Sequence, residues 1–323
     1  MRRWSESSRR DAVLAAVVVV LFGAVAARFP AFAAPANVAQ LLDDSAILIL
    51  LALGQMLVIL TRGIDLSVAA NLAFTGMVAA LVNSAWPGIG IGVLLLLSAA
   101  LGACLGAVNG ILIWKLRLPP IVITLGTMSI YRGCIYVLSH GTWVNENEMT
   151  AAFVDFVRRE WLGLSTLAWS AILVSVVFFV SLRSLRAARN FYVVGGNPHA
   201  AQFAGIEPGR VQFWSYVISG AIAGLCGYLW VARFAVAYTD VALGFELQVI
   251  AACLVGGVAI AGGTGTVVGV VLGCLFLGVI KNALPLVGVS AFWQMFINGV
   301  VILVAVVLSV SREQRRTILE NAA

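Results

Sequence analysis

Long apolar segments, separated by short polar breaks or by glycine and proline, run along most of the chain. A helix needs about 20 predominantly apolar residues to cross a bilayer. Ten segments meet this requirement, and they are longer and less alternating than the roughly ten-residue strands of an outer-membrane barrel. We therefore predict an all-α polytopic membrane protein of about ten transmembrane helices. The predicted spans are residues 12–33, 38–61, 66–84, 89–114, 119–139, 164–182, 211–232, 246–262, 265–283 and 291–310.

The composition supports a membrane protein. Of the 323 residues, 62% belong to the apolar set and only 11% are charged, and the mean hydropathy is +1.03. A soluble domain carries about 25% charged residues. The composition therefore argues against a water-soluble enzyme or a nucleic-acid-binding domain.

The placement of basic residues predicts the orientation in the membrane, because cytoplasmic loops are enriched in Lys and Arg. If ten spans begin and end inside, 14 of the 20 basic residues lie on the cytoplasmic side. Both termini are then cytoplasmic, with an N-terminal tail over 1–11 and a C-terminal tail over 311–323. The net charge of +6 and the pI near 9.4 follow from this topology and require no nucleic-acid partner.

The first span has a second interpretation as a cleaved signal peptide, since a basic start precedes the apolar stretch from Ala12 to Ala27 and the small residues that follow. Cleavage would leave nine spans. We favour a retained span because the repeat described below includes it. The cysteines show no metal-ligand spacing and are expected to be small buried residues; they are Cys104, Cys134, Cys226, Cys253 and Cys274.

Two segments 181 residues apart share a motif of glycine, apolar residue, acid, leucine, any residue, valine, any residue and alanine. They are Gly63–Ala70 and Gly244–Ala251, and each precedes a helix with glycine at every fourth position and then a proline break. Five spans in each half, an odd number, would give the halves inverted orientation about an axis in the membrane plane. The halves are residues 12–163, with an outer loop, and 164–310. Chance similarity between segments rich in glycine and alanine is the alternative.

The motif and the glycine rows each predict a local role. Asp65 and Glu246 sit where a helix begins, so we expect both carboxylates to cap the helix or to complement its positive end. The glycine rows are expected to let helices approach one another closely. These rows are Gly102, Gly106 and Gly110 in the first half and Gly265, Gly269 and Gly273 in the second.

The motifs of nucleotide and metal chemistry are missing from the sequence. No Walker motif occurs, because the glycine-rich run from Gly256 to Gly265 lacks the Lys-Ser/Thr pair that contacts phosphate. His140 and His199 are far apart in the sequence and form no metal-binding motif. We therefore predict that the chain is not an enzyme and holds no cofactor and no metal.

An ion-coupled secondary transporter remains the alternative class, and it normally needs a carboxylate deep in the membrane. The acids of this chain fall at span ends or in loops, with Asp43 and Asp44 the deepest. This weakens the ion-coupled interpretation without excluding it. Arg132 is the one charge placed well inside a predicted span, and it can also reach the outer surface by extending along its helix.

The most polar cytoplasmic segment covers residues 183–210. Within it, Asn197-Pro198 suits a helix start and Gly205 suits a stop. A short helix carrying Phe203, followed by Ile206, would lie outside the membrane and could dock on another protein. The alternative is an ordinary connecting loop.

Several of these segments, taken together and in this order, resemble the membrane permease subunits of bacterial ABC sugar importers. The resemblance is greatest to the rhamnose and autoinducer-2 permeases, with similarity also to the ribose group, because of Ala52–Arg62 and Tyr131–Gly133. One departure is Ala69-Ala70, where the family usually has Gly-Ser after Asp-Leu-Ser-Val. The remaining matching segments are Gly63–Val68, Asn109-Gly110, Leu118–Thr127, Gly195–Ile206 and Gly244–Gly263 with Gly265.

The resemblance implies a pathway subunit in the bacterial inner membrane that pairs with a second permease, identical or homologous. Two cytoplasmic ATP-binding subunits would hydrolyse ATP, and a periplasmic binding protein would deliver the monosaccharide. Transport would proceed by alternating access. The residues that match the family's ATPase-contacting loop are Asn197, Pro198, Ala200, Ala201, Phe203 and Gly205.

A neutral sugar is bound by hydrogen-bonding groups without fixed charge, and the spans contain several. Each could instead make a hydrogen bond between helices. The candidate pathway residues are Gln55, Asn71, Thr75, Asn109, Thr124, Thr127, Trp293, Gln294 and Asn298.

Overall fold

The computed structural model describes residues 2–290 and, beyond them, Trp293, Phe296, Ile297, Gly299, Val300, Leu303 and Val307. Most of the predicted tenth span, with Gln294 and Asn298, lies outside the described residues. Among the described residues, eight helices are long and apolar enough to cross a membrane, which agrees with an all-α polytopic fold. In chain order the elements are α1 (Arg2–Arg28), η1 (Pro30–Ala33), α2 (Pro35–Leu60), α3 (Val68–Ala85), α4 (Ile91–Leu116), α5 (Pro120–Ser139), β1 (Val144–Asn145), η2 (Glu146–Glu148), α6 (Ala151–Arg158), β2 (Glu160–Trp161), β3 (Leu164–Ser165), α7 (Thr166–Ser184), α8 (Arg186–Gly196), α9 (Pro198–Phe203), α10 (Pro208–Phe234), β4 (Val236–Ala237), α11 (Phe245–Val255) and α12 (Val267–Leu286).

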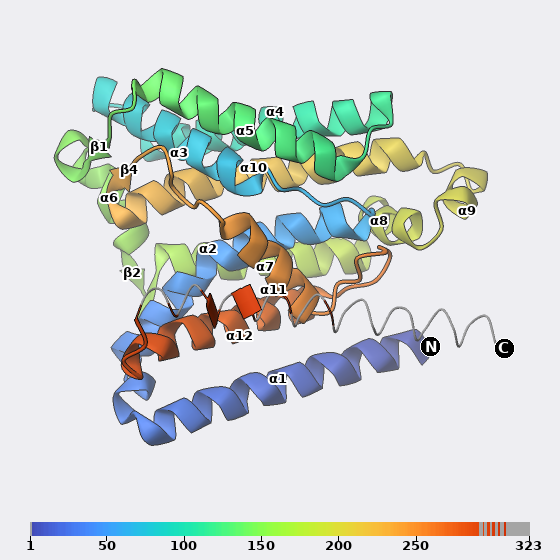
Figure 1. The fold of residues 1–323 in the computed structure, drawn as a ribbon, viewed down its shortest axis with the longest axis horizontal. Coiled ribbons are helices and arrows are strands. Elements are labelled where there is room, and N and C mark those ends of the chain that lie inside the picture. The colour runs from blue at the N-terminus through green and yellow to red at the C-terminus, as the bar shows by residue number, and fades with distance from the viewer. Residues whose placement is uncertain are drawn as a thin grey trace.

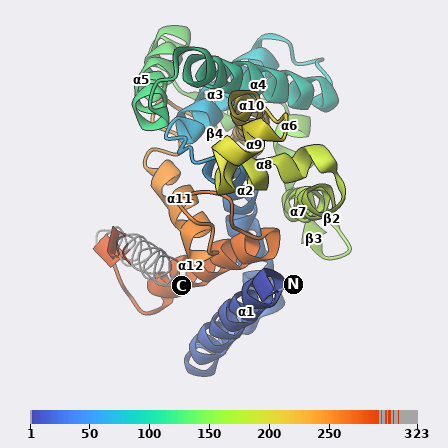
Figure 2. The same cartoon turned by 90° about the vertical axis from the view of Figure 1, so that its right-hand side faces the viewer.

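Helix α2 is the central element of the bundle. It packs against α7, α10, α11 and α12, and Figures 1 and 2 show these helices around it. Every residue from Ser45 to Leu60 is buried. A helix that is apolar on all sides belongs in the interior of its protein, and the sequence of α2 has this character.

Helices α4 and α10 touch backbone to backbone along the first glycine row. A Cβ atom on Gly102 would lie 2.3 Å from the carbonyl oxygen of Gly220, and one on Gly106 would lie 2.2 Å from that of Tyr216. The second row meets α11 in the same way, since a Cβ on Gly273 would lie 2.3 Å from the carbonyl oxygen of Ala252. The prediction of close helix contacts is confirmed for the first row and for Gly269 and Gly273 of the second, whereas Gly265 lies in the turn before α12.

The two ends of the bundle differ in character. Helices α8 and α9 lie at one end together with the start of α1, and we call this the α9 end (Figure 1). Short strands and α6 lie at the opposite end, which we call the strand end. There β1 pairs antiparallel with β4, with Val144 opposite Ala237, and β2 pairs with β3. The basic residues predict that the α9 end faces the cytoplasm.

Helix α11 is shorter than the predicted span of residues 246–262. The helix ends at Val255, and residues 256–266 form turns. Gly257, Gly262 and Gly263 have φ angles of +80°, +84° and +71°, which a right-handed helix cannot contain. The predicted span was therefore wrong beyond Val255. Residues 256–262 are apolar enough for a span, but their backbone forms turns instead of a helix.

Helix α1 is joined to the rest of the bundle through α12 and the turn that precedes it. Arg10 donates from Nη1 to the carbonyl oxygen of Gly257 at 2.6 Å. The hydroxyl of Thr266 donates to Asp11 Oδ2 at 2.7 Å. These contacts place the first turns of α1 beside the turns of residues 256–266.

The cysteines are only partly as predicted. Cys226, Cys253 and Cys274 are buried, whereas Cys104 and Cys134 are exposed. The two exposed thiols lie on α4 and α5, helices whose outer faces contact no other part of the described chain. The expectation that all five are buried was wrong for these two.

Candidate functional site

The short helix α9 lies at the α9 end of the bundle. It begins after Asn197 and ends before Gly205, as predicted. Asn197 Oδ1 accepts a hydrogen bond from the backbone N–H of Ala200 at 3.0 Å and so caps the helix, with Pro198 in the first turn. Gly205 follows the helix with a φ of +78°, the left-handed region that favours glycine. The predicted helix between Asn197 and Gly205 is confirmed.

The exposure of residues in this segment defines what it presents to its surroundings. Phe203 is 94% exposed, whereas Ala201 is fully buried against the bundle. Ile206 is half-buried. Phe203 is therefore the side chain that α9 presents to its surroundings, while Ala201 packs against the bundle.

Three segments meet behind α9 at the side chain of Arg62. Its Nε donates to the carbonyl oxygen of Gly195 at 2.8 Å, and its Nη2 donates to that of Gly196 at 3.1 Å. These carbonyls belong to the last two residues of α8, where carbonyl groups have no partner within the helix. Arg62 has a positive φ of +65°, a conformation that surrounding contacts must hold in place. The end of α2 is thus tied to the end of α8.

The turns of residues 256–266 complete this meeting point, which we call the Arg62 junction. The N–H of Gly263 donates to the carbonyl oxygen of Leu60 at 3.0 Å. The backbones are so close that a Cβ on Gly195 would lie 1.7 Å from the same oxygen. Motion of α8 would therefore act directly on α2 and on the turns before α12.

Tyr192 makes a second link between α8 and these turns. Its hydroxyl donates to the carbonyl oxygen of Gly265 at 3.2 Å. Burial raises the pKa of the Tyr192 phenol to about 12. The phenol therefore stays protonated and keeps donating this bond over the whole physiological pH range.

The non-helical segment between α2 and α3 carries the first acid of the repeated motif. Asp65 is buried, and its Oδ1 accepts hydrogen bonds from the backbone N–H of Ser67 at 2.8 Å and from the Ser67 hydroxyl at 2.6 Å. Asn109 donates to the Ser67 hydroxyl at 2.8 Å, and Thr127 donates to Asn109 Oδ1 at 2.7 Å. A chain of four polar side chains therefore connects the start of α3 to α4 and α5.

Among the predicted pathway residues, those on α4 and α5 make hydrogen bonds within the bundle. Asn109 and Thr127 belong to the chain just described, and the Thr124 hydroxyl lies 3.0 Å from the carbonyl oxygen of Pro120 on its own helix and 3.2 Å from that of Ile64. Thr75 donates to the carbonyl oxygen of Asn71 on its own helix at 2.9 Å. These contacts are those of interhelical and intrahelical packing.

Gln55 and Asn71 each have a buried polar group without a hydrogen-bond partner among the described residues. Gln55 is fully buried on α2, and neither atom of its amide group finds a hydrogen-bond partner among the described residues. Asn71 donates to the carbonyl oxygen of Gly102 at 3.1 Å, while its Oδ1 finds no partner in the described part of the chain. Trp293 is 61% exposed.

The second acid of the repeated motif lies near the strand end. Gly244 has a φ of +78°, and Glu246 sits in the first turn of α11, 8% exposed. Arg132 on α5 donates from Nη1 to the carbonyl oxygens of Thr239 at 3.0 Å and Val241 at 2.7 Å. Arg132 therefore binds the backbone that leads into α11.

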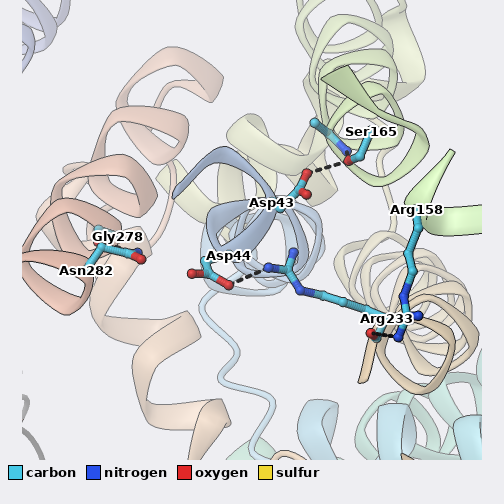
Figure 3. Close-up of polar contacts among 8 residues, drawn as sticks. Asp43, Asp44, Arg158, Ser165, Arg233, Gly278 and Asn282 are labelled. Carbon is cyan, nitrogen blue, oxygen red and sulfur yellow. Dashed lines mark hydrogen bonds and ion pairs between the residues drawn. The ribbon is translucent and has the colours of Figure 1, made fainter. Parts of the chain in front are cut away.

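Asp43 and Asp44, the deepest acids expected from the sequence, are half-buried and are both engaged by other side chains at the strand end (Figure 3). Asp44 forms an ion pair with Arg233, the last-turn arginine of α10. Asp43 accepts a hydrogen bond from the hydroxyl of Ser165. Arg158 donates to the carbonyl oxygen of Arg233 at 3.2 Å. Asp43 and Asp44 therefore join α2 to β3 and α10.

Sequence reasoning missed Arg62, Tyr192 and Arg233 as residues that connect elements. Arg62 was one of many basic residues at the predicted cytoplasmic side. Its position in Thr61-Arg62-Gly63, between an apolar segment and a glycine, marks the end of a span but does not indicate its partners. The partners of all three residues lie far away in the sequence, so no local pattern identifies them.

The fold and this arrangement define a multi-pass membrane protein with an exposed short helix, α9, at one end of the bundle. Residues 37–306 match the family described as branched-chain amino acid transport system / permease component. The chain belongs to this family. No solved structure matches the chain significantly.

Curated relatives extend over nearly the whole chain. The ribose import permease protein RbsC of Escherichia coli (strain K12) is 37% identical over 295 residues, covering 90% of this chain and 91% of the relative. The L-arabinose ABC transporter permease protein AraH of Azospirillum brasilense is 33% identical, covering 97% of this chain and 91% of the relative. The autoinducer 2 import system permease protein LsrC of Enterobacter sp. (strain 638) is 34% identical, covering 90% and 84%.

These similarities confirm the resemblance to permease subunits of ABC sugar importers. They also confirm a multi-pass protein of the bacterial inner membrane, together with the eight candidate spans of the described residues. The relatives are transport permeases by name, and none of the three names describes an enzyme.

Proposed function

We propose that this chain is the pathway subunit of an ATP-driven importer that moves a monosaccharide or a similar small polar molecule across the inner membrane. The substrate would be rhamnose, autoinducer-2 or a ribose-like sugar. The similarity to ribose, arabinose and autoinducer-2 permeases over most of the chain carries this proposal. The uncharged amides and hydroxyls in the interior suit a neutral substrate.

The energy would come from partner chains. We propose a complex with a second permease, the same or homologous, two cytoplasmic ATP-binding subunits and a periplasmic binding protein. Helix α9 supplies a docking surface for the ATP-binding subunit, with Phe203 at its exposed tip. The proposed coupling residues are Asn197, Pro198, Ala200, Ala201, Phe203 and Gly205.

We propose that the Arg62 junction transmits movements of α9 to the interior helices. When the ATP-binding subunits close, α9 moves with them and α8 follows. Arg62 passes that displacement to the end of α2, and Gly263 and Tyr192 pass it to the turns before α12. The interior segments would then open to the outside and back, as alternating access requires.

We further propose that the chain is built as an inverted repeat, which suits the same mechanism. The break before α3 and the break before α11 each carry the shared motif, and each places an acid at or near a helix start. We propose two halves, residues 12–163 and 164–310, with residues 183–210 as the coupling segment. Such repeats place the pathway near their interface, among interrupted helices.

Within the pathway, Gln55 and Asn71 are the members best suited to contact a substrate. Buried amides normally have hydrogen-bond partners in proteins or in ordered water, and these two retain unused groups. Thr75, Asn109, Thr124, Thr127, Trp293, Gln294 and Asn298 complete the proposed set.

The alternative of ion-coupled transport has less support. Asp43 and Asp44, the deepest acids predicted from sequence, are engaged by Ser165 and Arg233. An acid that binds and releases a coupling proton must be free to change its charge during the cycle. The ion pair with Arg233 opposes such a change at Asp44.

Site-directed crosslinking tests the proposal at α9. Phe203→Cys is placed in a background where the exposed Cys104 and Cys134 are serine, with Leu162→Cys as the control. Leu162 is equally exposed, 94%, but lies in the turn between β2 and β3. We expect Phe203→Cys to react with membrane-permeant reagents only and to crosslink to the ATP-binding subunit, and Leu162→Cys to react from outside. Labelling of Phe203→Cys from the periplasm would overturn the proposal.

A further inference from the structure

A large groove opens between α7, α8 and α10 beside the α9 end. Its volume is about 820 Å³, within the range of about 300–1,000 Å³ typical of small-molecule sites. The walls are mainly apolar, with Val177, Phe178 and Leu182 from α7 and Trp214 and Ile218 from α10. Phe191 of α8 lines it as well. Figure 2, viewed from this end, shows the three helices next to one another.

The walls of the groove belong to helices that face the lipid. On α7, Leu173 is 64% exposed and Val176 is 53% exposed, and side chains of this kind are covered by acyl chains in a bilayer. Trp214 is 49% exposed in the second turn of α10. Tryptophan favours the boundary between acyl chains and headgroups, so the groove runs from that boundary into the acyl region.

The groove is lined by one basic and one acidic side chain, Arg210 and Glu207, and the segment that forms its mouth has an excess of arginines. Besides Arg210, the segment of residues 183–210 contains Arg183, Arg186 and Arg189. Within the described part of the chain, none of these four arginines forms an ion pair with a carboxylate. Glu207 is the segment's single acid, and its Oε1 already accepts a hydrogen bond from Trp114 at 3.0 Å.

We propose that this groove binds an anionic phospholipid of the leaflet at the α9 end. An acyl chain lies between α7 and α10, and the headgroup phosphate pairs with Arg210. Basic pockets between transmembrane helices on the cytoplasmic side are suited to anionic headgroups. Because Asn190 and Phe191 of α8 line the same groove, the lipid also contacts the helix that carries the Arg62 junction.

Lipid retention by the purified full-length chain tests this proposal without any transport measurement. The protein is exchanged into neutral detergent with equal amounts of phosphatidylglycerol and phosphatidylcholine of the same acyl chains, and bound lipid is counted by native mass spectrometry. We expect phosphatidylglycerol to be retained about fivefold better, the preference that roughly 1 kcal/mol per basic residue near the surface provides. Equal retention of the two lipids would overturn the proposal.

Two variants separate the headgroup contact from the acyl contact. Arg210→Gln should lower phosphatidylglycerol retention to the phosphatidylcholine level, while Arg117→Gln, an exposed arginine in the turn between α4 and α5, should not. Ser181→Phe fills the groove and should lower retention of both lipids. Val180→Phe, on the exposed side of the same helix, is its control. Unchanged retention in both Arg210→Gln and Ser181→Phe would contradict the proposal.

A photocrosslinking residue in place of Val177 identifies the occupant of the groove directly. It therefore tests the proposal even if the Arg210 or Ser181 variant is unstable. In membranes that contain the whole complex, we expect it to label phospholipid. Capture of a second permease or of an ATP-binding subunit at this position would show that a protein occupies the groove, and the proposal would be wrong.

Discussion

Arg62, two residues beyond the end of α2, donates from Nε to the carbonyl oxygen of Gly195 at 2.8 Å, across 133 positions of sequence. The contact joins the most buried helix of the bundle to the amphipathic helix that precedes α9. A guanidinium suits this position because its donors are held in a rigid plane and can reach two carbonyls at once. The proposed coupling of α9 to the interior depends on this contact.

Replacing Arg62 should uncouple transport from ATP hydrolysis. Hydrogen bonds to charged groups contribute about 1.5–3 kcal/mol each when buried, and less for a partly exposed side chain such as this one. We expect Arg62→Ala to lower sugar uptake per ATP hydrolysed by about tenfold while the ATP-binding subunit still copurifies. Arg62→Lys should be intermediate, since an ammonium lacks the planar fork. Wild-type uptake per ATP in Arg62→Ala would contradict this role.

Gly195 and Gly196 provide a test position and a control for the close backbone contact at the Arg62 junction. A Cβ on Gly195 would lie 1.7 Å from the carbonyl oxygen of Leu60, whereas one on Gly196 would meet nothing within 4 Å. We expect Gly195→Ala to be destabilising by about 1–3 kcal/mol, as for overpacking in a tight core. Gly196→Ala should leave the thermal unfolding midpoint in detergent nearly unchanged. Equal midpoints for the two variants would show that the junction is looser than described.

The contact between α4 and α10 gives a second stability test. Gly106→Ala would place a Cβ 2.2 Å from the carbonyl oxygen of Tyr216 and should force the helices apart. Gly133→Ala on α5 is the control, because a Cβ there meets nothing within 4 Å. Thermal unfolding in detergent should show a lower midpoint for Gly106→Ala alone. An unchanged midpoint would mean that the glycine row does not set the helix spacing.

Gln55→Leu distinguishes a pathway residue from an ordinary buried amide. Removing a buried polar group that has no protein partner costs little stability or increases it. If Gln55 binds the substrate, uptake should nevertheless fall, by about tenfold for the loss of a substrate hydrogen bond. Uptake and unfolding midpoint are measured on the same preparation. A stable variant with wild-type uptake would remove Gln55 from the proposed pathway.

Several features of the fold follow from local sequence alone. The helices α2, α4 and α7 begin and end within about three residues of the predicted spans, because their apolar segments end at glycine, proline or charged residues. The short helix from Pro198 to Phe203 follows from its start signal, Asn197-Pro198, and its stop signal, Gly205. These residues determine backbone conformation through their own side chains, or through the absence of one.

Other features depend on contacts that local sequence does not encode. The end of α11 at Val255 was missed because hydropathy does not distinguish an apolar turn from an apolar helix. The sequence predicts that the glycine rows contact other helices, but it does not identify those helices. Arg62 and Arg132 bind backbone carbonyls 133 and more than 100 positions away. Every residue has a backbone carbonyl group, so the sequence does not show which carbonyl an arginine binds.

Uptake of labelled sugar into proteoliposomes tests the central claim most directly. The chain is reconstituted with its ATP-binding subunits, and the binding protein and radiolabelled ribose or rhamnose are supplied outside. We predict uptake that requires ATP within the vesicles and is unaffected when a protonophore abolishes the proton gradient. Uptake that persists without ATP and collapses with the gradient would contradict an account in which this chain is a pathway driven by a separate ATPase.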